Sequence, residues 1–351
     1  MSGTSLDGVD VAMVRTDGET IDELGAFKSY PFEEDFRDRM RNSFGKSQGL
    51  EALEREVTDR HIQAVERFLQ TEGLRRDEVT LIGFHGQTVH HEPENKITVQ
   101  LGDGALMAKS VGIDVVNDLR TADVQAGGQG APLVPIFHAA LTKDMERPLA
   151  VLNLGGVGNV TWIGRDGELL AFDTGPANAL VDDWMQKHTG LAFDEDGLTA
   201  MKGEIHDDCV NSFMAHPYFQ QTGPKSLDRE EFKRIAFELV EGLSLEDGSA
   251  TLTALTVASV LRAQDAFPER AQMWIVCGGG RLNKSMMSAF RGFLYGAILS
   301  AEDVGWNGDA IEAQAFAYLA ARSARGLAIT FPGTTGIKTP LSGGRYNRAK
   351  T

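Results

Sequence analysis

The pattern of apolar and polar positions in the first third of the chain alternates between strand and helix periods. Apolar runs predict strands at Val9–Val14, Val79–Phe84, Ile97–Leu101 and Ile113–Asn117. Between the first two, apolar residues spaced three and four positions apart predict a long helix over residues 47–72. This order of elements is typical of an α/β domain.

A second α/β region follows a Gly-rich break at Ala126–Pro132. Its predicted strands are Leu149–Leu154, Asn159–Ile163, Leu169–Phe172 and Met273–Cys277. Its predicted helices cover residues 136–141, 178–188, 228–243, 249–266 and 311–323. The sequence therefore predicts an N-terminal domain of residues 1–135 plus 335–351 and a C-terminal domain of residues 136–334.

One internal similarity suggests how the two domains are related. Residues 1–10 form a Gly-Ser-Thr turn that leads into a strand, and residues 149–163 read as strand, Gly-rich turn and strand. We interpret them as equivalent hairpins in two related domains that face each other across a cleft. On this interpretation the first copy lacks its leading strand.

Composition narrows the class of protein. The chain has 351 residues and a net charge of −16, with a pI near 5.0, which disfavours nucleic acid and anionic membrane as partners. ATP is still compatible, because turn amides and Mg²⁺ supply local positive potential. Neither cysteine belongs to a CxxC pair, and no apolar run reaches membrane-spanning length. We therefore expect a cytoplasmic protein.

The opening turn is the first candidate site. Its glycines allow sharp turning and close approach of a ligand, and its amides and hydroxyls suit phosphate oxygens. Asp7 is placed to orient magnesium-bound water. The alternative is an ordinary turn before a strand, and the two readings are about equally supported by this segment alone. The candidate nucleotide-binding residues here are Gly3, Thr4, Ser5, Leu6, Asp7, Gly8, Val9 and Asp10.

Two further glycine turns follow buried strands, at Gly155-Gly156 and at Gly278-Gly-Gly280. The second would let a flat ligand such as adenine and its ribose lie against the backbone. Glycine turns between strands are common, so each is weak evidence alone. The chain has neither a GxGxxG fingerprint nor a GxxxxGK[ST] phosphate loop. A dinucleotide-dependent dehydrogenase and a P-loop kinase are therefore disfavoured.

Asp173 is the candidate catalytic residue. It follows the strand predicted to end at Phe172, and a carboxylate at a strand end facing a cleft suits general-base chemistry. The alternative is a turn or helix-entry residue. The candidate substrate-binding residues are His85 and Gln87 after one strand, Arg120 after another, and Glu312 at a helix start. Their alternatives are a structural histidine, a surface ion pair and a charge that favours the helix N-terminus.

Together, the motifs resemble those of the anhydro-N-acetylmuramic acid kinases over nearly the whole chain. The matching segments are Met1-Ser-Gly-Thr-Ser-Leu-Asp-Gly-Val-Asp10, Gly83-Phe-His-Gly-Gln-Thr88, Ala126-Gly-Gly-Gln-Gly-Ala-Pro-Leu-Val-Pro135, Asn153-Leu-Gly-Gly156, Phe172-Asp-Thr-Gly-Pro-Ala-Asn178, Gly223-Pro-Lys-Ser226 and Val276-Cys-Gly-Gly-Gly280. The resemblance implies the two-domain α/β fold of the sugar kinase, heat-shock chaperone and actin superfamily, with an inter-domain cleft. It also implies Mg²⁺ and ATP as cofactors.

The implied reaction transfers phosphate from ATP to the 6-hydroxyl of 1,6-anhydro-N-acetylmuramic acid while water opens the anhydro bridge. Asp173 matches the family's catalytic aspartate, and Gly3–Asp10 matches its ATP-binding segment. Members of the family usually carry a short apolar strand before the Met-Ser-Gly-Thr turn, so we expect a start site upstream of Met1. A homodimer is plausible for a small metabolic enzyme.

Two other functions are compatible with the same fold. One is a kinase for an ordinary hexose or amino sugar, which would need a base for a sugar hydroxyl and not for water. The other is a non-catalytic nucleotide-binding module, which would bind ATP without sugar-stimulated release of ADP. The Asp173 motif favours an enzyme.

Overall fold

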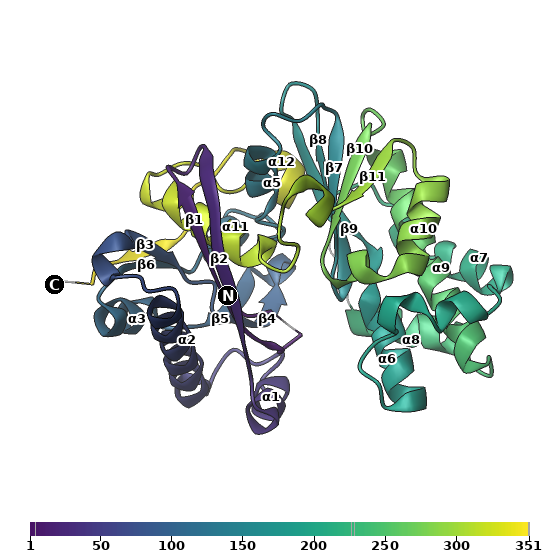
Figure 1. The fold of residues 1–351 in the computed structure, drawn as a ribbon, viewed down its shortest axis with the longest axis horizontal. Helices are drawn as coiled ribbons and strands as arrows, with labels where there is room; N and C mark the ends of the chain where they lie inside the picture. The colour runs from purple at the N-terminus through teal and green to yellow at the C-terminus, as the bar shows by residue number, and fades with distance from the viewer. Residues whose placement is uncertain (4, 226, 228, 350–351) are drawn as a thin grey trace. The chain divides into compact units, whose positions relative to one another are not determined.

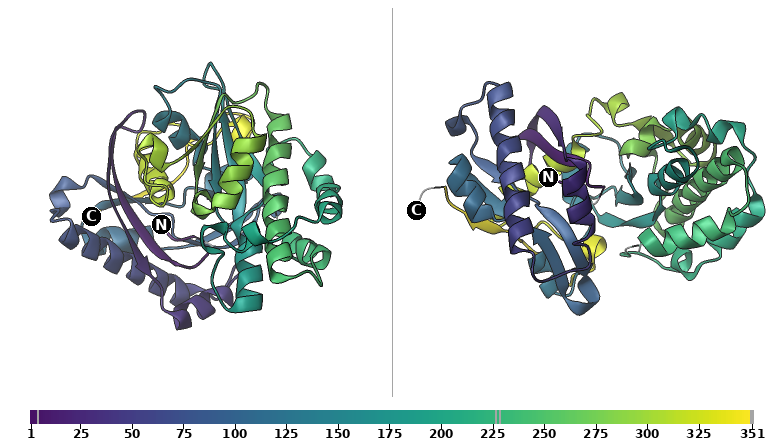
Figure 2. Two further views of the ribbon diagram at one scale, coloured as in Figure 1. Left: turned by 45° about the vertical axis from the view of Figure 1, so that its right-hand side comes forward. Right: turned by 90° about the horizontal axis from the view of Figure 1, so that it is seen from below.

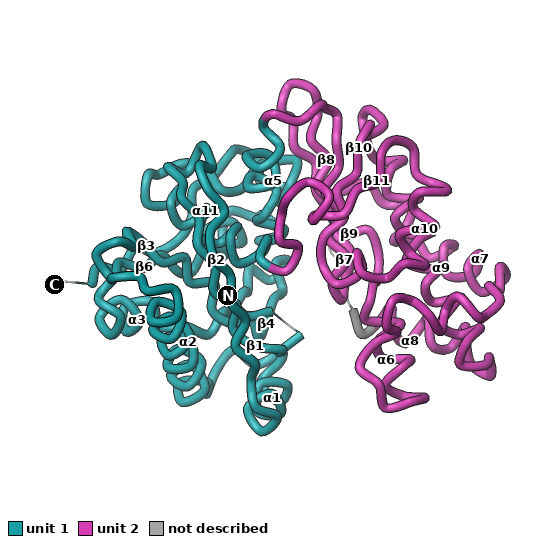
Figure 3. Tube along the Cα trace, in the orientation of Figure 1, with its two compact units in different colours: residues 1–143, 310–351 teal, residues 144–309 magenta. Residues whose placement is uncertain are grey.

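The computed structural model describes residues 1–3, 5–225, 227 and 229–349. Its residues form two compact units, Met1–Lys143 with Ala310–Thr351, and Asp144–Asp309 (Figure 3). These limits differ from the predicted domain limits at residues 135 and 334. The difference arises because the helix Ile311–Ala324, predicted in the C-terminal domain, packs against the first strands of the first unit.

The first unit contains most of its secondary structure before residue 143. Its elements are β1 (Gly8–Thr16), β2 (Ile21–Pro31), α1 (Glu34–Arg41), α2 (Glu51–Thr71), β3 (Leu81–Gly83), β4 (Gln87–Glu92), β5 (Ile97–Leu101), α3 (Gly104–Val111), β6 (Asp114–Asn117), α4 (Thr121–Gln125), α5 (Pro135–Leu141), α11 (Ile311–Ala324), α12 (Pro332–Thr335) and β12 (Arg345–Asn347). Helix α2 packs along β1, and α3 packs beside α2 (Figure 1, Figure 2).

The strands of the first unit form three separate sheets among the described residues. β1 pairs antiparallel with β2, β4 pairs with β5, and the third sheet has the order β12-β6-β3. Among the described residues, the free edge of β1 pairs only at Asp10, which bonds through its N–H and its carbonyl to Met1, both at 2.8 Å. No other strand of the described chain continues this edge toward β3.

An apolar cavity of about 80 Å³ lies where β1 and β3 approach each other in the first unit. Residues of β1, α2, β3 and α11 line it, among them Ala12, His61 and Ala317. The His61 ring is buried, with Nδ1 2.8 Å from the Val57 carbonyl, and its Nε2 has no partner in the described part of the chain. Packing in this unit is therefore interrupted at its centre.

The second unit is built on one continuous sheet. Its elements are β7 (Leu149–Leu154), β8 (Val157–Ile163), β9 (Leu169–Pro176), α6 (Asn178–Thr189), α7 (Asp207–Met214), α8 (Arg229–Leu239), α9 (Leu245–Ala263), β10 (Met273–Cys277), α10 (Lys284–Phe293) and β11 (Ala297–Ser300). The five strands have the order β11-β10-β7-β8-β9. β11, β10 and β7 are parallel, and β8 and β9 are antiparallel additions.

Local sequence explains the central elements of this unit. β7 is almost continuously apolar because neighbours cover both of its faces, as is usual for central parallel strands. Helix α9 is rich in small buried residues, and Ser244 caps its start by accepting a hydrogen bond from the Asp247 amide at 3.0 Å. None of the helices in the described residues is long and apolar enough to span a membrane.

Most predicted elements are confirmed, and three strands have the predicted limits: Ile97–Leu101, Leu149–Leu154 and Met273–Cys277. The predicted end of β9 at Phe172 is wrong. The strand continues to Pro176, because Asp173 still pairs with Asn159 on β8.

Candidate functional site

Two glycine turns lie at the carboxyl ends of neighbouring parallel strands in the second unit. Cys277, the last residue of β10, is in register with Asn153 on β7, and the turns Gly155–Gly156 and Gly278–Gly280 follow directly. The carbonyl of Gly155 accepts a hydrogen bond from the Asn178 amide at 3.0 Å, which fixes the first turn to the start of α6. This edge of an open α/β sheet is where ligands usually bind.

The glycines of these turns are not equivalent. Gly278 has φ +73°, and a Cβ there would lie 2.4 Å from Oδ1 of Asn153. A Cβ at Gly280 would lie 2.5 Å from the Leu154 side chain, so packing alone requires both glycines. At Gly155 the nearest atom to a Cβ would be 3.8 Å away. Gly155 itself is half-buried, and the exposed residues of the two turns are Gly156 and Gly279.

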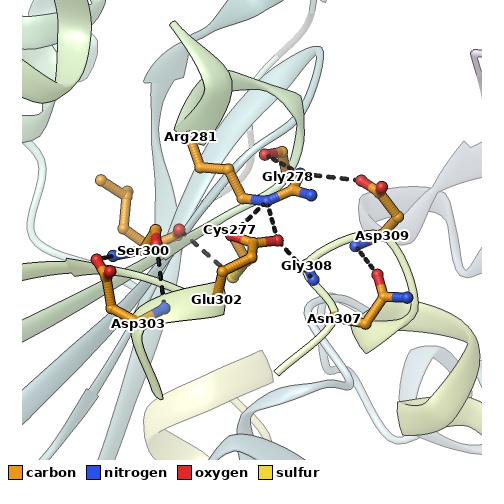
Figure 4. Close-up of polar contacts among 10 residues, drawn as sticks. Cys277, Gly278, Arg281, Ser300, Glu302, Asp303, Asn307, Gly308 and Asp309 are labelled. Atoms are coloured by element: carbon orange, nitrogen blue, oxygen red, sulfur yellow. Dashed lines mark hydrogen bonds and ion pairs between the residues drawn. The ribbon is translucent and has the colours of Figure 1, made fainter. Parts of the chain in front are cut away.

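Arg281, which the sequence analysis missed, anchors the second turn (Figure 4). Its side chain is only 5% exposed, and its Nη1 donates to the Gly278 carbonyl at 3.0 Å. Its guanidinium also pairs with Glu302 and Asp309, both at 2.9 Å. The Glu302 and Asp309 side chains are 50% and 62% exposed, so the buried guanidinium joins the Gly278 turn to two carboxylates at the surface. An arginine directly after three glycines was a signal for this role.

Asp173 lies within β9, opposite Asn159, and not beyond the strand as predicted. Its amide donates to the Lys225 carbonyl at 3.0 Å, and its carbonyl accepts the Tyr218 hydroxyl at 2.6 Å. Its Oδ2 accepts the Leu227 amide at 3.1 Å. Asp173 is thus held through its backbone and its side chain.

The environment of Asp173 changes its acidity. Burial raises the pKa of the Asp173 carboxyl group from 3.8 to about 7, while the Leu227 amide and the Lys225 charge act in the opposite direction. A carboxyl group with a pKa near neutrality can accept a proton and release it again at cellular pH. The side chain therefore has the acidity of a general base.

The opening turn of the first unit divides into core and exposed residues. Leu6 and Val9 are buried in a hydrophobic cluster, so their side chains are not ligand contacts. Ser5 and Asp7 are exposed, and Thr4 lies outside the described residues.

Two backbone features shape this turn. A Cβ at Gly8 would lie 2.3 Å from the Tyr30 carbonyl oxygen, so the pairing of β1 with β2 already requires that glycine. Leu6 has φ 59°, which is uncommon outside glycine, and its amide donates to the Gly3 carbonyl at 3.2 Å. Such backbone conformations are concentrated at functional sites.

The structure brings His85 and Arg120 together. Arg120 Nη2 lies 3.1 Å from Nε2 of His85, and His85 Nδ1 lies 2.9 Å from the Gly86 carbonyl. Because arginine only donates and a carbonyl only accepts, Nδ1 carries the ring proton. Burial and the Arg120 charge hold the pKa of His85 well below its usual value, so the ring is neutral. Arg120 also donates to the Gly130 carbonyl at 2.7 Å.

Gln87 is a buried member of the same region. Its Nε2 donates to the Gly3 carbonyl at 3.1 Å, which ties the 83–88 segment to the opening turn. Its Oε1 is buried and has no partner in the described residues. Such an acceptor is costly unless a donor reaches it, so Gln87 is suited to a ligand hydroxyl.

Glu312 is exposed in the first turn of α11. Phe316, one turn later, stacks on His85 with ring centroids 4.4 Å apart and lies 5.9 Å from the Arg120 guanidinium carbon. Burial lowers the pKa of Arg120, while the carboxylates of Glu312 and Asp123 act in the opposite direction. The four predicted substrate residues of this unit therefore belong to two neighbouring segments and one helix start.

Asp123, also missed by the sequence analysis, organises the glycine-rich segment. Its carboxylate accepts the Gly130 amide and the Thr335 hydroxyl, both at 2.6 Å. The Gln129 amide donates to the Thr335 carbonyl at 2.7 Å. A Cβ at Gly128 would lie 2.2 Å from Oδ1 of Asp123. This network presents the Gly130 carbonyl to Arg120.

Two α/β units with glycine turns at the strand ends are typical of ATP-using kinases of the actin-like class. Comparison with known proteins identifies the family. A family model described as anhydro-N-acetylmuramic acid kinase matches residues 1–347. The chain belongs to the anhydro-N-acetylmuramic acid kinase family.

The relatives match over nearly their whole length. Anhydro-N-acetylmuramic acid kinase of Paramagnetospirillum magneticum is 52% identical over 347 residues, 99% of this chain and 98% of that protein. The Rhodospirillum rubrum protein of the same name is 51% identical over 357 residues, 100% of this chain and 94% of that protein. Among solved structures, component A of (R)-2-hydroxyglutaryl-CoA dehydratase from Acidaminococcus fermentans is 10% identical with a TM-score of 0.48, covering 92% and 96% of the two chains.

Proposed function

We propose that this kinase phosphorylates the 6-hydroxyl of 1,6-anhydro-N-acetylmuramic acid with ATP while water opens the anhydro bridge. The products would be N-acetylmuramic acid 6-phosphate and ADP, which places the reaction in murein recycling and amino sugar degradation. The names of the relatives support the proposal that the substrate is the anhydro sugar. The observation that carries the chemistry is Asp173, a carboxyl group with a pKa of about 7 that its neighbours hold in one position.

Asp173 acts as the general base. It takes a proton from the water that attacks the anomeric carbon, the bond from that carbon to the bridging oxygen breaks, and the freed oxygen attacks the terminal phosphate of ATP. Because only the charged carboxylate can accept the proton, kcat/KM should rise with pH up to about 7 and level off above it.

The glycine turns bind the nucleotide. Gly155, Gly156, Gly278, Gly279 and Gly280 would contact ATP in the second unit through their backbone, and Gly156 and Gly279 are the exposed residues of the two turns. In the first unit, Ser5 and Asp7 are exposed and Gly3 and Asp10 are half-buried among the described residues of the opening turn.

The opening turn also fits Mg²⁺. Asp7 offers one exposed carboxylate, and Mg²⁺ is usually held by one or two carboxylates together with retained waters and substrate phosphates. Asp7 would hold the ion through water. When bound, Mg²⁺ neutralises charge on the phosphates.

His85, Gln87, Arg120 and Glu312 bind the sugar. A neutral imidazole, an unpartnered amide oxygen and a guanidinium offer an uncharged surface, a hydroxyl acceptor and a cation in one region. The substrate carries hydroxyls and a lactyl carboxylate, which these groups complement.

The enzyme is a cytoplasmic homodimer in this proposal. No disulfide joins Cys209 and Cys277 in the described residues, as is usual in a reducing compartment. A groove on the second unit is lined by apolar residues that include the exposed Ile205 and Phe293, and a symmetric dimer would bury such a patch on both copies. Analytical ultracentrifugation should show a dimer that Phe293→Glu converts to a monomer.

Product analysis tests the proposed reaction. ADP release should be stimulated by the anhydro sugar and not by N-acetylmuramic acid or glucose. In water enriched in ¹⁸O, label should enter the product at the anomeric position. ADP release with glucose, or a phosphorylated product without label, would instead identify a kinase for an ordinary sugar.

A further inference from the structure

A row of polar side chains crosses the sheet of the second unit beside the two glycine turns. Asn153 on β7 is paired with Asn159 on β8, and Asn159 is paired with Asp173 on β9. Residues directly opposite each other in antiparallel strands carry their side chains on the same face of the sheet. The two carboxamides and the carboxyl group therefore form one row across three neighbouring strands.

The next pair along β8 and β9 agrees with this orientation. Val160 is paired with Phe172, and both side chains are buried in the hydrophobic core of the unit. Successive side chains of a strand point to opposite faces of the sheet, so Asn159 and Asp173 point away from that core. Both residues are half-buried. The row is therefore not part of this apolar core.

The side chains of Asn159 and Asp173 have hydrogen-bonding atoms that the described residues leave unused. The Asn159 carboxamide has no partner among them, and Asp173 has one only at Oδ2, from the Leu227 amide at 3.1 Å. Directly opposed residues have Cβ atoms about 4.5–5.5 Å apart. A water that makes hydrogen bonds of about 2.8 Å to two oxygens spans a similar distance. One water therefore fits between these two side chains.

Asn153, the other carboxamide of the row, is less suited to hold such a water. β8 separates it from the strand that carries Asp173. Its Oδ1 also lies against the second glycine turn, because a Cβ at Gly278 would be 2.4 Å from it. Asn159 is thus the carboxamide of the row that stands next to the carboxyl group.

We propose that Asn159 is a second catalytic residue, which holds the attacking water against Asp173. The inference rests on the proposed role of Asp173 as the base. The water donates one hydrogen to Oδ1 of Asp173 and the other to Oδ1 of Asn159, since a carboxylate and an amide oxygen both accept. This leaves a lone pair of the water oxygen for the anomeric carbon.

The step is balanced with these two groups. As the water oxygen bonds to the anomeric carbon, its first proton passes to Asp173, and its second hydrogen stays on the new anomeric hydroxyl. The bond from that carbon to the bridging oxygen breaks, and the electron pair remains on the bridging oxygen, which then attacks the terminal phosphate. Asn159 exchanges no proton, so it orients the water without titrating.

Asn159→Leu tests the proposal, because it keeps the size of the side chain and removes its hydrogen-bonding groups. kcat should fall about 10–100-fold, the cost of a misplaced reacting group, while calorimetric titration with ADP should give normal affinity. Asn211→Leu, at an exposed position of α7 in the same unit, is the control. A normal kcat in Asn159→Leu, or a higher KM for ATP at normal kcat, would overturn the proposal.

Asn159→Asp gives a second readout that does not depend on the folding of Asn159→Leu. It keeps an oxygen acceptor but places a second carboxyl group beside Asp173. Two like charges disfavour each other, so the acidic limb of kcat/KM should move to higher pH by about one unit. At pH values above the shifted limb, kcat should exceed that of Asn159→Leu. A residue that only supports the fold would leave the limb in place, so an unshifted limb would contradict the proposed role.

The Asp173→Asn variant separates failure of this inference from failure of the proposed function. If Asp173→Asn is inactive while Asn159→Leu is fully active, Asn159 does not hold the water and Asp173 is still the base. If Asp173→Asn is active, the base itself is wrong, and the role of Asn159 is wrong with it.

Discussion

The two units of this enzyme differ in their sheets, because among the described residues only the second unit has one continuous sheet. In the second unit, β7 lies between β8 and β10 in a five-stranded sheet. In the first unit, β1–β2 and β12-β6-β3 are separate, and an apolar cavity lies between β1 and β3. A central strand pairs with a neighbour at each edge and places side chains on both faces of the sheet. A unit without such a strand is therefore less tightly packed, even when its chain is continuous.

The candidate functional groups follow the same division. The second unit places Asp173 on a strand of its continuous sheet and anchors the Gly278 turn through Arg281. The first unit holds its substrate candidates mainly on segments joined by long-range hydrogen bonds, such as the one between His85 and Arg120. A reacting group needs fixed geometry, which rigid elements provide better than loops.

The largest expected effect is that of Asp173→Asn. It should lower kcat by about 10²–10⁴-fold, because a positioned base contributes that much, while ADP binding remains close to normal. Steady-state kinetics and calorimetric titration with ADP would measure both. Asp166→Asn, at an exposed position of the same unit, is the control. If the Asp173→Asn variant keeps a nearly normal kcat, Asp173 is not the general base.

Arg120→Met probes the first unit and should act mainly on binding. Hydrogen bonds to a charged group contribute about 1.5–3 kcal/mol, so KM for the sugar should rise about 10–100-fold with a smaller change in kcat. Arg348→Met, which removes an exposed charge from the same unit, is the control. A large loss of kcat at unchanged KM would mean that catalysis is shared between the two units.

A matched pair of Ala→Val substitutions tests the difference in packing. Ala150 on β7 is fully buried in the continuous sheet, so Ala150→Val should lower the free energy of unfolding by about 1–3 kcal/mol. Ala12 on β1 lines the cavity, so Ala12→Val should raise the free energy of unfolding by about 0.5–1 kcal/mol. Urea denaturation measures both values. Equal destabilisation by the two substitutions would show that the first unit is as tightly packed as the second.

Amide hydrogen exchange gives the finest comparison. Val151 lies in a strand that is paired on both sides, whereas Ala12 lies on the β1 edge that no described strand continues past Asp10. The Ala12 amide should therefore exchange faster than the Val151 amide at the same pH and temperature. Similar protection at the two positions would contradict a split sheet in the first unit.

The sequence by itself determined the elements with the strongest apolar patterns. β7 and β10 have the predicted limits because continuous apolar runs between glycine turns leave few alternatives. β2 and β12 were not predicted, since both are partly exposed and β12 also depends on β6, a partner distant in the chain. The residue types and order of the motifs were also sufficient to recognise the family.

Tertiary structure alone decided how the candidate residues act. The pKa of Asp173 depends on burial and on Lys225 and Leu227, which are more than 50 residues away along the chain. His85 meets Arg120, and Arg281 meets Glu302 and Asp309, only after folding. Local patterns report the backbone preferences of neighbouring residues, whereas acidity and hydrogen bonding depend on groups that distant segments bring into contact.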